Sequence, residues 1–261
     1  MHLQDHIQER ADLSPATRRL GAYILLTDDE VCQLEELQNN RAVYSPGETI
    51  IEVGATFRYA FAVRRGVVLA YRISRGGRRQ IITVYLPGDF VALQINFDRR
   101  ATMTYSALGN CELALIEPAR LLDIYASRPV LAAGLEWASV WDYNVLAEHN
   151  FGLGVRSATQ RVLAILLELW CRLRICGEAD ESGMELPLTQ QHLADICGIS
   201  LVHTNKSLQR LRDVGLLHMR GRHMRFPDPE AASEYADFDA SFMPALDNAH
   251  REKTSVVGMS A

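Results

Sequence analysis

The residues with the clearest chemical potential lie between Leu188 and Phe226, near the C-terminal end of the chain. From Ile199 to Phe226, six Lys and Arg residues are present with a single acid, Asp213, which leaves a local charge of +5 in a chain whose net charge is −5. A concentrated basic face is what phosphate contact requires. Amide, imidazole and ammonium groups also donate to base edges in the major groove. The segment therefore predicts binding to double-stranded DNA.

Two short helices must position these side chains. Thr189 is a good N-cap for a first helix, and Ser200 is a good N-cap for a second. Gly198 lies at the turn between them, where glycine adopts a positive φ at little cost, and Gly215 ends the second helix. Two helices joined by a short glycine-containing turn form the helix-turn-helix layout. The following run LLHMRGRHMRF predicts a tight hairpin, which would serve as a wing.

The predicted DNA contacts lie at the start of the first helix, on the exposed face of the second helix and in the wing. They are Thr189, Gln190, Ser200, Leu201, Val202, His203, Asn205, Lys206, Gln209, Arg210, Arg220, Arg222 and Arg225. A capped helix pair is common in other proteins, and an arginine-rich hairpin is usually a solvated face. The alternative is a ligand-binding effector module that acts through protein partners, which would lack a steep salt dependence.

The remainder of the chain predicts two further parts. From about residue 41 to 116, short β-rich runs alternate with turn glycines, which is typical of a barrel or sandwich. A long helix follows, with an apolar seam that packs either on its own β domain or, as we favour, on a second copy of the chain. The seam residues are Leu131, Leu135, Ala138, Trp141 and Val145.

Five segments are expected along the chain: a helical lead-in, a β domain, a dimerisation helix, a DNA-binding domain and a tail. Their predicted bounds are 1–27, 28–128, 129–152, 153–230 and 231–261.

Composition narrows the class of protein. Hydrophobic residues are 48% and charged residues 23%, as in soluble globular proteins. With no spanning apolar run and no secretory signal in the first residues, the chain is expected in the cytoplasm, away from membranes. Five cysteines without a C-x-x-C pair predict reduced thiols, and we expect no metal or cofactor. None of the common catalytic motifs is present, so we predict no catalytic residues and no enzyme.

The stretches LTQQHLADICGIS…LQRLRDVGLL and YSPGETIIEVG…LPGDF make the chain resemble the Crp–Fnr family of bacterial regulators over about residues 28–230. The resemblance implies an α+β fold with an N-terminal β-roll sensor domain (jelly-roll-like), a long dimerisation helix and a C-terminal winged helix-turn-helix. It also implies a homodimer on a two-fold-symmetric promoter site, in contact with RNA polymerase.

The chain departs from the family pattern at the sensor site. Cyclic-AMP-binding members carry a Gly-Glu pair after the PGDF-like turn, where this chain has Ala92 and Leu93. The basic residue and hydroxyl that would bind an effector phosphate correspond to Arg99 or Arg100 with Thr102. Since the ribose-binding carboxylate is missing, we expect that the effector, if one exists, is not cyclic AMP.

Two other departures concern oxygen sensing and the DNA sequence that is read. No cysteine precedes Cys32, which argues against the iron–sulfur centre of the oxygen-sensing members. Many members place an Arg-Glu pair where Leu201 and Val202 stand, and only Lys206 matches. Apolar side chains at those positions favour thymine methyl groups, so we expect a half-site unlike that of the cyclic-AMP receptor.

Overall fold

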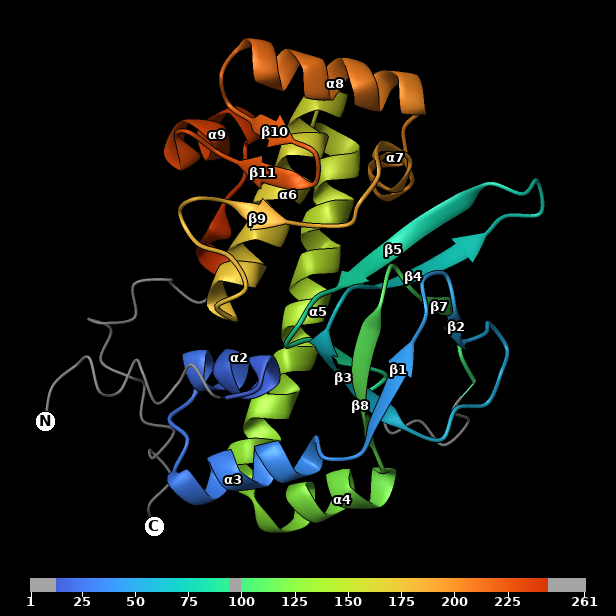
Figure 1. Cartoon of the computed structure of the whole chain (residues 1–261), viewed down its shortest axis with the longest axis vertical. Coiled ribbons are helices and arrows are strands. Elements are labelled where there is room, and N and C mark those ends of the chain that lie inside the picture. The colour runs from blue at the N-terminus through green and yellow to red at the C-terminus, as the bar shows by residue number, and fades with distance from the viewer. Residues whose placement is uncertain (1–12, 94–99, 244–261) are drawn as a thin grey trace, which may run out of the picture.

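The computed structural model describes residues 13–93 and 100–243 (Figure 1). Arg99 and parts of the predicted lead-in and tail therefore lie outside the described residues. In the described part, no helix is both long and apolar enough to cross a membrane. The helices are α2 (Pro15–Tyr23), α3 (Asp28–Leu37), α4 (Pro118–Ser127), α5 (Pro129–Val155), α6 (Ala158–Ile175), α7 (Gln190–Cys197), α8 (Leu201–Asp213), α9 (Pro229–Ala236) and the short 3₁₀ helix η1 (Ala240–Phe242).

Two four-stranded antiparallel sheets form the β domain, in the orders β1-β8-β3-β6 and β2-β7-β4-β5. Their apolar inner faces pack on each other, with Val63, Val68 and Leu113 buried between them. This arrangement confirms the predicted α+β fold with an N-terminal β-roll. The strands are β1 (Arg41–Tyr44), β2 (Thr49–Ile51), β3 (Ala60–Arg65), β4 (Val68–Ile73), β5 (Arg79–Tyr85), β6 (Phe90–Val91), β7 (Thr104–Ala107) and β8 (Cys111–Ile116).

Helix α5 runs along the molecule from α4 to the C-terminal helices (Figure 1). It continues through Gly152 and Gly154 to Val155, beyond the end predicted from its glycines. The five seam residues predicted to face a second copy are at most 2% exposed. Leu131, Leu135 and Ala138 share a core with α2, whereas Trp141 and Val145 pack against α6. The seam is thus corrected to an internal one, because helices of the same chain already cover it.

The turn between β5 and β6 is wedged between α2 and the end of α6. Gly88 in this turn has a φ of +93°. A Cβ added there would meet the carbonyl oxygen of Pro15 at 2.9 Å and the sulfur of Cys176 at 2.6 Å. Glycine is required because the two helices approach the turn backbone too closely for a side chain.

Asp89, the next residue, is the centre of a buried ion network. Its carboxylate pairs with Arg19 of α2 and Arg172 of α6, and all three side chains are at most 4% exposed. The same carboxylate accepts the backbone N–H of Leu86 at 2.7 Å, which closes the turn. Arg172 also pairs with Glu168 at 2.6 Å. Burial opposes ionisation of Glu168, but His149 and Arg172 together hold its pKa below the usual value.

Replacing Asp89 with Asn tests the importance of this network. The variant keeps the side-chain shape but leaves two buried guanidinium groups without their shared carboxylate. We expect the free energy of unfolding, measured by urea denaturation, to fall by about 3 kcal/mol or more. The matched control is Asp29→Asn, which breaks an ion pair with Arg128 at the surface. The Asp29 side chain is 63% exposed and the Arg128 side chain 38% exposed. That pair is expected to contribute less than about 1 kcal/mol. Equal losses in the two variants would contradict the assignment.

Candidate DNA-binding interface

Helices α7 and α8 form the predicted helix-turn-helix. Thr189 caps α7 by accepting the backbone N–H of His192 at 3.2 Å, and Ser200 caps α8 by accepting that of His203 at 3.3 Å. Between them Gly198 has a φ of +65°, which ends α7 in the left-handed conformation. The sequence determines this geometry locally, because each cap and the turn depend only on residues within a few positions.

Helix α8 is anchored along one side and free along the other. Thr204, Ser207, Leu208 and Leu211 are buried, and Thr159 of α6 donates to the Ser207 hydroxyl at 3.2 Å. In Figure 1, α8 lies across one end of the molecule, with no other element beyond it. This position leaves the free side of α8 open to a duplex.

The wing is a small antiparallel sheet. Strands β10 (His218–Arg220) and β11 (His223–Arg225) pair around a tip at Gly221, as predicted. A third strand, β9 (Met184–Glu185), pairs with β11 and was not predicted, since two residues carry no readable alternation. Phe226 packs against Trp170 of α6 with the ring centroids 5.4 Å apart. The wing is therefore fixed to the DNA-binding domain, while its arginines point away from the core.

All of the residues predicted to contact DNA are exposed on α7, α8 and the wing. No ion pair found within residues 13–93 and 100–243 involves Lys206, Arg210 or the wing arginines. Leu201 is 40% and Val202 61% exposed, which leaves two apolar side chains at the N-terminal end of α8. The surface thus combines unneutralised cations with apolar contacts, as base and phosphate recognition requires.

Three of these residues have an additional structural role. The Thr189 and Ser200 hydroxyls each accept a backbone N–H as a helix cap. Any contact that they make with DNA must therefore be made in addition to the cap. Gln209 lies between Asp213 and Arg212 and bonds to both, at 2.6 and 2.7 Å.

The predicted effector residues do not form an enclosed site in the described part of the chain. Arg100 and Thr102 are exposed, and Arg99 lies outside the described residues. Ala92 has a φ of +58°, a conformation that glycine adopts freely, whereas Leu93 packs against the core shared by α2 and α5. Leu93, the residue expected at the ribose-binding position, is thus an apolar packing residue in this structure.

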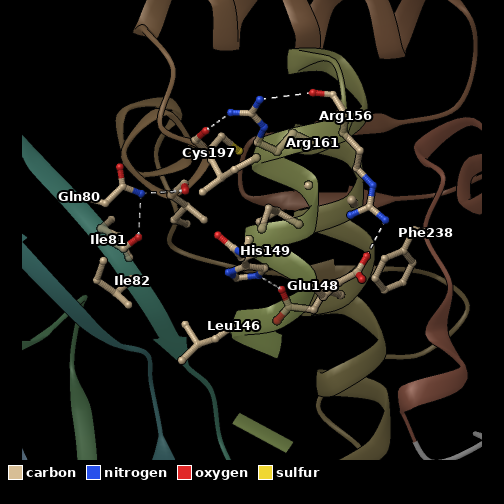
Figure 2. A pocket seen from close by; sticks show the side chains of 17 residues that line it. Gln80, Ile81, Ile82, Leu146, Glu148, His149, Arg156, Arg161, Cys197 and Phe238 are labelled. Atoms are coloured by element: carbon tan, nitrogen blue, oxygen red, sulfur yellow. Dashed lines mark hydrogen bonds and ion pairs between the residues drawn. The ribbon is translucent and has the colours of Figure 1, made fainter. Parts of the chain in front are cut away.

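A cavity of about 320 Å³ lies at the joint between the β domain and the DNA-binding domain. Figure 2 shows its walls, which come from β5, α5, α6 and α7, with Phe238 at one side. Arg156 pairs with Glu148 at 2.5 Å, and Arg161 donates to the Cys197 carbonyl at 2.7 Å. Neither contact crosses the joint, but the Gln80 amide of β5 does: it donates to the Ile196 carbonyl of α7 at 3.0 Å and so helps to fix the orientation of the DNA-binding domain.

The residues of the joint and of the ion network were missed by sequence reasoning. An isolated Arg or Asp on an apolar element gives little signal, because its partner is many residues away. The turn motif LPGDF places Asp89 after a glycine, but a turn glycine is equally expected from its positive φ, so the motif does not reveal the ion network.

Comparison with known proteins identifies both parts of the chain. The cyclic nucleotide-binding domain family matches residues 41–128, and the Crp-like helix-turn-helix domain family matches residues 160–233. The nitrogen fixation regulation protein FixK of Bradyrhizobium diazoefficiens is 26% identical over 190 residues, which cover 72% of this chain and 79% of FixK. The transcriptional activator protein FnrA of Stutzerimonas stutzeri is 24% identical over 195 residues, covering 75% and 80% of the two chains.

The fold agrees with these matches. The solved structure of FixK2 from Bradyrhizobium japonicum superimposes with a TM-score of 0.67 at 23% identity, covering 75% of this chain and 96% of FixK2. A β-roll followed by a long helix and a winged helix-turn-helix defines the class as DNA-binding transcription regulators. Within that class, the chain belongs to the Crp–Fnr family, as both domain matches and the similar regulators indicate.

Proposed function

We propose that the protein acts as a homodimer that binds a two-fold-symmetric promoter site, with one α8 helix in each major groove. The observation that carries the proposal is the exposed, doubly capped helix-turn-helix whose cations have no ion-pair partner in the described chain. Two α8 helices about one helical turn of DNA apart (~34 Å) would engage both half-sites.

Each part of the interface has a distinct role in this proposal. Lys206 donates to a guanine edge or a phosphate, and His203 and Asn205 donate nearby. Leu201 and Val202 contact thymine methyl groups. The wing residues Arg220, Arg222 and Arg225 bind phosphates, which sets register and affinity without reading sequence. Two similar proteins are named as transcriptional activators, which supports contact with RNA polymerase at a promoter.

The outer face of α5 supports the homodimer. The residues of this face follow one another at alternating spacings of three and four over most of the helix, which is the heptad pattern of a coiled coil. Trp137, Val140 and Phe151 on this face are 50%, 48% and 47% exposed. Large apolar side chains exposed along one helix face indicate a protein–protein interface. The complete heptad row is Val130, Ala133, Trp137, Val140, Asn144, Ala147 and Phe151, in which Asn144 is polar and half-buried and the two alanines are small.

The β domain is proposed to work without cyclic AMP, because its ribose-binding carboxylate is replaced by Leu93. The alternative, a ligand-binding module that acts through protein partners, is disfavoured by the exposed cations of α8 and the wing, which form no ion pair within residues 13–93 and 100–243. A protein partner would not require such a charge excess.

The direct test is to incubate the purified protein with sheared genomic DNA, without added ligand, and to sequence the retained fragments. We expect enrichment of a two-fold-symmetric motif, because the basic and apolar side chains of α8 are exposed and available to a duplex. If no motif is enriched under any salt condition, ligand-independent binding to a specific site is wrong.

Lys206→Ala is expected to weaken binding to the enriched site by about tenfold or more, since the ammonium group no longer donates to a base or phosphate in either half-site. Titration of a labelled duplex measures the change. Arg120→Ala is the control: it removes an exposed positive charge from α4, at the end of the molecule opposite α8 (Figure 1). Equal effects of the two variants would remove Lys206 from the interface.

Val140→Asp is expected to convert the dimer to a folded monomer, because it places a charge on each side of the proposed interface. Sedimentation measures the mass, and affinity for a duplex with two half-sites should fall far more than affinity for one half-site. Val43→Asp changes a residue that is 76% exposed on β1 and serves as the control, which should remain dimeric. A dimeric Val140→Asp variant would place the interface elsewhere.

A further inference from the structure

One long stretch of the β domain contains no acidic residue at all. Between Glu52 and Asp89 the chain has neither Asp nor Glu, although the protein as a whole is acidic. The basic residues of this stretch are Arg58, Arg64, Arg65, Arg72, Arg75, Arg78 and Arg79. The last four lie on the β4–β5 hairpin, which projects from the β domain beside α7 (Figure 1).

Three of the four hairpin arginines form no ion pair within the described part of the chain. Arg72, Arg75 and Arg78 are exposed, and none of the ion pairs within the described ranges involves them. The turn that carries them is ordered: Ser74 donates its backbone N–H to the Arg78 carbonyl at 2.9 Å, and Gly77 donates to the Ser74 carbonyl at 2.9 Å. The charge is therefore presented by a defined hairpin tip.

The hairpin is tied directly to the helix-turn-helix. Arg79 pairs with Asp195 of α7 at 2.7 Å, and the Gln80 amide donates to the Ile196 carbonyl at 3.0 Å. The hairpin and the start of α8 line one cleft of about 600 Å³, with Arg78 on one side and Ser200 and Leu201 on the other. The basic tip thus lies beside the N-terminal end of the recognition helix, although it belongs to the other domain.

We propose that the β4–β5 hairpin tip is a second DNA-contacting surface, in which Arg75 and Arg78 bind backbone phosphates outside each half-site. When α8 lies in the major groove, backbone phosphates lie on either side of it. The DNA outside the half-site then continues past the hairpin tip, which lies beside the start of α8. Arginine forks match phosphate oxygens, and each neutralised phosphate releases counterions. The inference rests on the proposed DNA binding by α8 and extends the footprint onto the β domain.

An acidic protein surface would also attract these arginines. The duplex is favoured because the tip continues the basic surface of the helix-turn-helix and is held there by Arg79 and Gln80. A protein partner would bind the tip independently of whether α8 is engaged with DNA.

The test compares two duplexes that carry the enriched site, one ending at the outer edges of the half-sites and one extended by about one helical turn on each side. For Arg75→Ala/Arg78→Ala, we expect affinity for the extended duplex to fall about tenfold at low salt. The slope of log K against log salt should fall by roughly 0.9 for each phosphate that the variant no longer neutralises. Affinity for the short duplex should change little. Arg75→Lys/Arg78→Lys should retain most of the slope, because it retains the charge.

Arg120→Ala is the control, since Arg120 is exposed on α4 at the end of the molecule opposite α8 (Figure 1). Thermal unfolding of every variant checks that the hairpin remains folded. If the wild type binds both duplexes and the double variant matches it on both, the hairpin contact is wrong while binding through α8 stands. The hairpin contact with DNA is also wrong if DNA affinity is unchanged and only transcription with RNA polymerase falls. That result would indicate that the tip contacts a protein. If the wild type binds neither duplex, the proposed function itself fails.

Discussion

Two buried guanidinium groups require a carboxylate between them, and Asp89 supplies it. Arg19, Asp89 and Arg172 come from α2, the β5–β6 turn and α6, so one shared carboxylate joins the lead-in, the β domain and the DNA-binding domain. Burying these charges is unfavourable unless all of them are paired. Moving any one of the three elements away would leave a buried charge without its partner. Gly88 allows the close approach, because a side chain there would collide with α2 and α6.

The position of α5 follows from this arrangement. With α2 and α6 held against the β domain, one face of α5 is covered along its length and contributes Leu131, Leu135 and Trp141 to the core. Only the outer face remains, and it also carries apolar residues. A helix that is apolar on two faces is expected to be covered on both. The same scaffold that fixes the inner face therefore presents the outer face for association and carries the DNA-binding domain at its end.

Charge is distributed to match this scaffold. Buried cations are paired, Arg19 and Arg172 with Asp89 and Arg156 with Glu148, and the half-buried Arg79 pairs with Asp195. The cations of α8, the wing and the hairpin tip are exposed and lack such partners in the described chain. An acidic protein thereby keeps a concentrated positive surface around one helix.

The sequence alone determined the helix-turn-helix, since its caps at Thr189 and Ser200, its turn at Gly198 and its local charge all depend on neighbouring residues. It also determined the β-roll, through strand runs and turn glycines. It did not determine which apolar stripe of α5 faces inward, because two stripes of similar character lie on one helix and only packing against α2 and α6 selects between them. Nor did it reveal the Arg19–Asp89–Arg172 network or the contact of Arg79 with Asp195. Those partners are separated by long stretches of chain, so only the tertiary structure brings them together.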